Sequence, residues 1–294
     1  MAQRMASGCS WAALLAVVYL APALPAFAAQ PHDMVTLRQA CDADTHATVL
    51  RADASELPAS AVWLDATRLQ WPGMADGQAG VRHRLLHAVA GGIDATPGQP
   101  ARGMDGVLPL SADTSALPPA LQLRHRHLAP GLRLALADAS AAQLQALHRG
   151  QLVLVLEDSA GRVLRATRVQ AAAALDDIYA PAEQLADLGV RRTARGMHWR
   201  LWAPTAQTVW LCLHATDKAA AAPAVPAMQR DAATGSWHLH LPQPLPGRYY
   251  RYLVDVWVPG AGLVRQRVTD PYAIGLGTDG RHAWAGSLDE PATQ

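Results

Sequence analysis

Phenylalanine, cysteine and net charge are all scarce in this sequence. Its 294 residues include one Phe and three Cys, and the formal net charge at pH 7 is +1. Tryptophan, tyrosine, leucine and valine must therefore build the hydrophobic cores. The near-neutral charge, with no basic run, argues against nucleic-acid binding, which depends on neutralising phosphates. The length suits one large domain or two ordinary ones, each able to bury a core.

The N-terminus has the three parts of a secretory signal peptide. Arg4 precedes an apolar run from Trp11 to Leu20, and Ala26-Phe27-Ala28 supplies an A-x-A cleavage site. The run is too short to span a bilayer comfortably, so an uncut membrane anchor is the less favoured alternative. We predict a signal peptide at residues 1–28 and a secreted protein, extracellular or periplasmic, that leaves the membrane after cleavage.

Cleavage would remove Cys9 and leave two cysteines, Cys41 and Cys212. An exported protein can join such a pair in a disulfide. The two positions fall in different predicted domains, however, so we expect two free thiols.

Hydrophobic patterning divides the rest of the chain into three parts. Residues 29–60 are rich in Ala and Asp without a sustained period, and predict a loose lead-in. Residues 61–175 contain short strand-like runs and predict a first β domain. Residues 176–290 contain only short strands separated by Pro and Gly turns, which predicts a β-sandwich.

Individual elements are also indicated. Ser140 to Gln143 has the spacing of a capping box at a helix start, and Gly150 is placed to end that helix in a left-handed conformation. Residues 171–187 are expected to form a linker or domain boundary. The predicted strands include 81–88, 152–156, 162–169, 199–202, 208–214, 237–241 and 249–258.

Several stretches late in the chain carry a family resemblance. They run from Trp199 to Ala206, from Met228 to Trp237, from Leu245 to Tyr252 and from Val268 to Tyr272. Through them, residues 188–288 resemble the isoamylase-type N-terminal module, carbohydrate-binding module family 48, of bacterial pullulanases.

Two earlier stretches, Ala61 to Gly73 and Leu175 to Tyr179, resemble the domain just upstream of this module in secreted pullulanases and plant limit dextrinases. The resemblance implies a mainly β chain with two β-sandwich-like domains. The second would be immunoglobulin-like, of the early-set type, and the first would contain one short helix.

Enzymes of this family hydrolyse the α-1,6 branch links of pullulan, glycogen and limit dextrins. The resemblance implies that two catalytic carboxylates lie in a following (β/α)₈ barrel of the family-13 glycosidase type. Such a barrel needs about 250 residues, whereas six residues follow Leu288. Arg51-Ala-Asp53 matches the bare R-x-D around such a nucleophile, but it lies in the lead-in and is interpreted as chance.

We therefore expect the non-catalytic N-terminal part of a secreted α-1,6-debranching glycoside hydrolase, inactive alone, which engages α-glucan and docks a catalytic domain. The alternative is a free-standing extracellular α-glucan-binding protein. No catalytic residue, cofactor or metal site is predicted. His238 and His240 share a strand face, but a zinc site needs a third and usually a fourth ligand, and none is apparent in the sequence.

Trp257 is the leading candidate for contact with a glucan. Alternation places it outward, on a polar strand face with Arg251 and Asp255. There it is predicted to be a sugar platform or a docking surface, and Trp284 could serve either role. Glycogen-binding members place a Trp shortly before the closing Asp-Pro strand, but residues 262–268 contain none, so weak binding is expected. The other late tryptophans are assigned to the core or an interface: Trp199, Trp202, Trp210 and Trp237.

Overall fold

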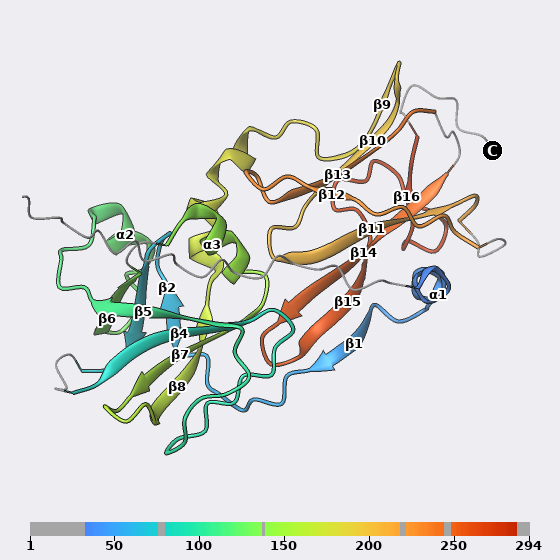
Figure 1. The fold of residues 1–294 in the computed structure, drawn as a ribbon. Helices are drawn as coiled ribbons and strands as arrows, with labels where there is room; N and C mark the ends of the chain where they lie inside the picture. Colours follow the sequence, from blue (N-terminus) through green and yellow to red (C-terminus); the bar gives the residue numbers. More distant parts are fainter. Residues whose placement is uncertain (1–32, 76–79, 137–138, 218–221, 244–247, 287–294) are drawn as a thin grey trace, which may run out of the picture.

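The computed structural model describes residues 33–75, 80–136, 139–217, 222–243 and 248–286. It confirms a mainly β chain, arranged as two β units side by side (Figure 1). The signal peptide predicted for residues 1–28 lies outside the described residues. Within the described ranges, no helix is long and apolar enough to cross a membrane.

The first unit is a closed β-barrel rather than the sandwich that the resemblance implied. Its strands pair in the order β2-β3-β6-β5-β4-β7-β8, and β2 closes the ring by pairing in parallel with β8. The strands are β2 (Ala61–Trp63), β3 (Arg68–Pro72), β4 (Arg82–Ala88), β5 (Gly106–Ala112), β6 (Gly131–Leu136), β7 (Gln151–Glu157) and β8 (Val163–Gln170). Closure pairs the strand edges that an open sheet would leave exposed.

The central strand β7 shows how the barrel core is built. Leu154 points into the barrel and packs in one cluster with Trp63. Val153 and Val155 point to the outer face, where Ile93 of the loop after β4 covers them. Because β7 is buried on both faces, its sequence is a continuous apolar run instead of an alternating one.

Helices α2 (Pro119–Arg124), α3 (Ala141–Leu147) and α4 (Ala172–Ile178) accompany the barrel, where one helix was expected. The predicted capping box is confirmed at α3, since Ser140 N donates to Gln143 Oε1 at 2.8 Å and Gln143 N donates to Ser140 Oγ at 3.3 Å. The left-handed stop predicted at Gly150 is wrong, because Gly150 is not among the glycines with positive φ. Gly150 instead lies so close to the Ala88 carbonyl that a Cβ would overlap it.

The second unit is a two-layer sandwich of antiparallel sheets. One sheet has the order β1-β15-β14-β11 with β16 beside β14, and the other has the order β12-β13-β10-β9. Tyr250 and Tyr252 of the first sheet pack against Trp199 of the second in the core. The strands are β1 (Ala47–Ala52), β9 (Gly189–Thr193), β10 (Gly196–Trp202), β11 (Ala206–His214), β12 (Gln229–Arg230), β13 (Ser236–Leu241), β14 (Tyr249–Val258), β15 (Gly262–Val268) and β16 (Ala283–Trp284).

Within the loose lead-in that was predicted for residues 29–60, the described residues from Asp33 onward contain a helix and a strand. Helix α1 (Met34–Asp42) begins at Asp33, whose carboxylate accepts from two backbone N–H groups of the first turn. Strand β1 then pairs with β15 of the sandwich. The described chain thus starts on the second unit, passes through the barrel and returns (Figure 1). Because β1 is exposed throughout, its sequence lacks the alternation that marks a half-buried strand.

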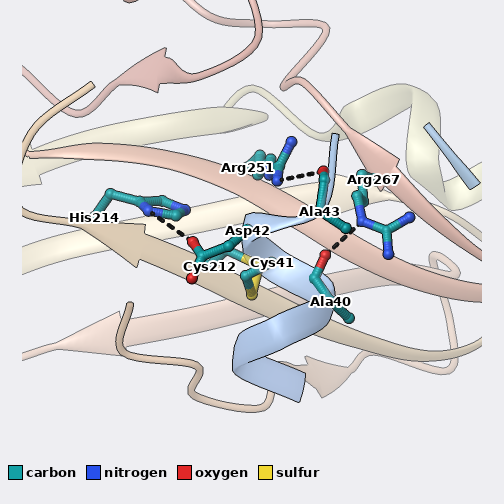
Figure 2. Close-up of a disulfide and its surroundings, with 8 residues drawn as sticks. All are labelled: Ala40, Cys41, Asp42, Ala43, Cys212, His214, Arg251 and Arg267. Atoms are coloured by element: carbon teal, nitrogen blue, oxygen red, sulfur yellow. Dashed lines mark hydrogen bonds and ion pairs between the residues drawn. A yellow bond between two sulfur atoms is a disulfide. The ribbon is translucent and has the colours of Figure 1, made fainter. Parts of the chain in front are cut away.

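Cys41 and Cys212 form a disulfide, so the expectation of two free thiols is wrong (Figure 2). That expectation assigned the cysteines to different domains, whereas α1 packs on β11 and β14 and brings their Cα atoms to 5.7 Å. Arg251 and Arg267 donate to backbone carbonyls at the end of α1 (Figure 2). Positively charged side chains at this position stabilise the C-terminus of the helix, because its last carbonyl groups lack partners within the helix.

Candidate functional site

The polar face of β14 is buried, so the prediction that Trp257 faces outward is wrong. The exposed fractions of Arg251, Asp255 and Trp257 are 6%, 3% and 8%. Helix α1 covers the end of the strand near Arg251, and the barrel covers the end near Trp257. Alternation identified the polar face correctly but could not show that distant segments cover it.

Asp255 and Arg251 both contact segments of this chain. Asp255 accepts two hydrogen bonds of 2.8 Å from Arg265 of β15, and the Arg265 guanidinium lies 5.2 Å from the ring centroid of Trp210. Arg251 donates to the Ala43 carbonyl at 3.2 Å. Burial, together with the neighbouring Arg267 guanidinium, lowers the pKa of Arg251. These charges join β15 and α1 to β14.

Trp257 packs against Gly91 of the barrel. A Cβ at Gly91 would overlap the six-membered ring of the indole, and Gly91 also has a positive φ of 74°. Both features favour glycine at this position. Trp284 of β16 lies at the opposite end of β14, where it pairs with Tyr249. Its side chain is half-buried and contacts Gly286.

An exposed aromatic groove lies where the segment after α4 meets the sandwich. Trp202 and Tyr272 line this groove of about 230 Å³, and Asp176 and Glu183 add carboxylates. Trp202 is 38% exposed and Tyr272 is 48% exposed. The Trp202 Nε1 group donates to the Thr234 carbonyl at 2.9 Å, which fixes the indole in place. Such a groove is suited to a partner with an apolar surface.

Strand alternation in the sequence also indicates that Trp202 faces outward. Met197, Trp199 and Leu201 point into the sandwich, so alternation along β10 places Trp202 on the outer face with Arg200. Alternation along β14 likewise places Trp257 on the outer face of its strand.

Asp270 fixes the turn that presents Tyr272. Its carboxylate accepts from the hydroxyls of Tyr250 and Tyr252 at 2.6 and 3.1 Å, and from the backbone N–H of Tyr272 at 2.8 Å. Burial, together with the Asp270 carboxylate, raises the pKa of both tyrosines, which therefore remain protonated donors.

Two protein-family models match the chain, one in each β unit. The Pullulanase N2 domain matches residues 58–177, and carbohydrate-binding module 48, the isoamylase N-terminal domain, matches residues 187–273. The chain carries a pullulanase N2 domain followed by a family 48 module. The module has the immunoglobulin-like fold that was expected from the sequence.

Curated pullulanases are similar to this chain in sequence. Those of Klebsiella pneumoniae and Klebsiella aerogenes are 32% and 30% identical over 250 and 255 residues, which is 85% of this chain and 22% of each relative. Pullulanase 1 of Arabidopsis thaliana chloroplasts is 32% identical over 144 residues, 49% of this chain and 14% of the relative. The chain thus corresponds to N-terminal domains of pullulanases and spans 22% of the length of the Klebsiella enzymes.

Solved pullulanase structures agree with this assignment. The Klebsiella pneumoniae pullulanase complexed with maltotriose has a TM-score of 0.70 at 32% identity, over 80% of this chain and 22% of that chain. The apo pullulanase from the same organism has a TM-score of 0.68 at 30% identity, over 83% of this chain and 26% of that chain.

Polar contacts join the N2 domain to the module. Gln207 of β11 donates through Nε2 to two backbone carbonyls of the N2 domain, at 2.7 and 2.8 Å. Asp53, after β1, accepts from Gly260 N at 3.0 Å and from Gln151 Nε2 at 3.4 Å. The Asp of the R-x-D match therefore ties the two domains together.

The segment between the domains is also folded. A 3₁₀ helix, η1 (Ala180–Gln184), follows α4, and Tyr179 between them is 1% exposed. The Tyr179 hydroxyl accepts from Arg230 Nη2 at 2.9 Å, and its ring packs against Gly235 of the module. The Leu175 to Tyr179 stretch thus supplies a residue that joins the domains.

The histidines do not gather into a metal centre in the described part of the chain, where no group of three or more His, Cys, Asp or Glu could hold a metal. On β13, His238 is partly buried and His240 is exposed. His214 lies 3.8 Å from Asp42 (Figure 2), and its ring centroid is 4.6 Å from that of His282. Burial and the neighbouring His282 lower the pKa of His214 to about 4.

Proposed function

We propose that this chain is the non-catalytic N-terminal unit of an exported pullulanase-type α-1,6-glucosidase. In this role the family 48 module engages α-glucan, and the two domains together dock a catalytic domain. The main support is that two Klebsiella pullulanases are 30–32% identical over 85% of the chain, and that a family model matches each of its two domains.

The docking part of the proposal uses the groove of Trp202 and Tyr272. Ile274 and Leu276, two and four residues after Tyr272, are 49% and 54% exposed. Large apolar side chains that remain exposed are typical of an interaction surface. We assign this surface to a catalytic domain of the family-13 type, because pullulanases extend far beyond the region that this chain matches.

Among Arg251, Asp255, Trp257 and Trp284, we assign contact with glucan to Trp257 alone. Arg251 and Asp255 are instead assigned to holding α1 and β15 in place, since their charges are matched internally. Trp284 is assigned to packing at the edge of β14.

Export is supported by the Cys41–Cys212 disulfide and by the signal-peptide pattern of residues 1–28. Disulfides persist in oxidising compartments and are rare in the cytosol. The periplasm or the extracellular medium fits both observations.

Affinity electrophoresis in a glycogen gel tests the glucan part of the proposal. The full oxidised chain should migrate more slowly than it does in a gel without glycogen. Trp257→Leu should raise the apparent Kd about fivefold or more, because a buried aromatic contact carries more than about 1 kcal/mol of binding energy. Trp202→Ala is the matched control and should leave the retardation unchanged, since the groove is assigned to a protein partner. A wild-type chain that glycogen does not retard would contradict the proposal.

A further inference from the structure

A second cavity, of about 290 Å³, lies between the N2 domain and the module and is separate from the aromatic groove. The N2 side contributes His148 and Arg168, and the module contributes Thr205 and Trp257. Ligand sites favour domain interfaces and usually measure about 300–1,000 Å³, so this cavity has the position of a ligand site and the volume for a small ligand.

His148 has polar atoms that the fold leaves unused. The side chain is 6% exposed, and neither ring nitrogen has a hydrogen-bond partner among the residues that the structure describes. Its ring centroid lies 4.3 Å from that of Trp63, which holds the imidazole at the cavity wall. Buried polar groups in native proteins are usually paired, so two unpaired ring nitrogens at a cavity wall are available to hydrogen-bond a ligand. Burial lowers the pKa of His148 to about 4, so at neutral pH the ring offers one donor and one acceptor.

Arg168 of β8 also has an unpaired polar atom. Its Nε atom is buried and without a hydrogen-bond partner in the described part of the chain, and its guanidinium lies beside Gly260 of the module. The described residues that line the cavity include no Asp or Glu. The site therefore does not suit a cation.

The remaining choice is between an anion and a neutral polyhydroxyl compound. A neutral imidazole, which both donates and accepts, matches hydroxyl groups better than an anion that only accepts. Trp257 supplies an aromatic surface, and most of the other wall is apolar, as the faces of a pyranose ring require.

We propose that this cavity binds one terminal glucosyl residue of an α-glucan chain, with Trp257 against the ring face and His148 and Arg168 toward its hydroxyl groups. This inference rests on the proposed glucan binding and locates it at the joint between the domains. A sugar in the cavity would contact both domains at once and stabilise their association.

Isothermal titration of the full oxidised chain with maltotriose tests the assignment. Arg168→Ala should raise the Kd about tenfold or more, because it removes a charged donor. Ala172→Trp should abolish binding, because Ala172 is exposed at the cavity and a large side chain there would fill it. Arg165→Ala, three residues before Arg168 on β8, is the matched control and should bind as the wild type does.

If glycogen retards the chain but both Arg168→Ala and Ala172→Trp bind maltotriose with the wild-type Kd, the cavity assignment is wrong and the proposed function stands. If the wild type binds neither glycogen nor maltotriose, both fail. If inorganic phosphate binds and is lost in Arg168→Ala while maltotriose does not bind, the occupant is an anion and the inference is overturned. Should Arg168→Ala unfold, Ala172→Trp decides alone, since it removes no core contact.

Discussion

Asp53 accepts a hydrogen bond from Gln151 of the other domain, and Asp255 and Asp270 accept from Arg265 and Tyr250 on neighbouring strands. In each case a carboxylate satisfies donors that burial would otherwise leave unpaired, and an unpaired buried donor costs about 1–3 kcal/mol. These three aspartates therefore hold separate segments of the chain together.

His214 makes stability depend on pH. Its pKa is lowered from 6.5 to about 4, so the unfolded chain takes up a proton between these values that the folded chain does not. The free energy of unfolding should therefore fall as the pH drops from 6.5 to 4, with His214 contributing up to about 3 kcal/mol of the loss. Urea unfolding of the wild type and His214→Gln at pH 7 and pH 4.5 measures this.

In His214→Gln the fall between the two pH values should be smaller than in the wild type. Asp42, whose pKa burial raises, acts in the opposite direction and is present in both proteins. His240→Gln changes an exposed histidine and is the control. An equal fall in the wild type and His214→Gln would show that the burial of His214 has no effect on proton uptake.

Among the elements, α1 and β1 belong to the sandwich although they lie far before residues 176–290, where that domain was predicted. The disulfide links α1 to β11 across a sequence separation of 171 residues. A bridge over so long a loop restricts the unfolded chain strongly, and natural disulfides typically contribute about 2–5 kcal/mol.

The Cys41→Ser/Cys212→Ser double variant should accordingly lose about 2–5 kcal/mol of unfolding free energy in urea. Wild type treated with reductant should show a similar loss, and the double variant should not respond to reductant. Thiol titration of the native wild type should find neither Cys41 nor Cys212 reactive. Two reactive thiols, or a double variant as stable as the oxidised wild type, would contradict this role.

Sequence patterns predicted those elements whose causes are local. The capping box of Ser140 and Gln143, and the strand 249–258, depend on neighbours a few residues away. Strand β1 and the Cys41–Cys212 bridge depend on partners late in the chain, so no local pattern revealed them. For the same reason the burial of Trp257 was missed, because it requires Gly91 of the other domain.

At the scale of the whole molecule, the barrel and the sandwich form a joined pair. Closure of the barrel needs the parallel pairing of Ala61 with Val169, a long-range contact that strand-by-strand prediction does not provide, so a sandwich was expected there. Tyr179, Gln207 and Asp53 then connect the two units. The family motifs indicated the order of the domains, but the contacts that join them became visible only in the structure.

The groove of Trp202 and Tyr272 remains exposed in this arrangement, and we propose that a third, catalytic domain docks there. The direct test is the binding of the full chain to the catalytic domain of Klebsiella pneumoniae pullulanase, expressed without the domains that match this chain. We predict measurable binding by titration calorimetry, weakened about tenfold or more in Trp202→Ala/Tyr272→Ala. Leu164→Ala, which truncates an apolar side chain that is 44% exposed on β8, should bind like the wild type. The chain alone should release no reducing sugar from pullulan. Absence of binding, or release of reducing sugar by the chain alone, would contradict the account.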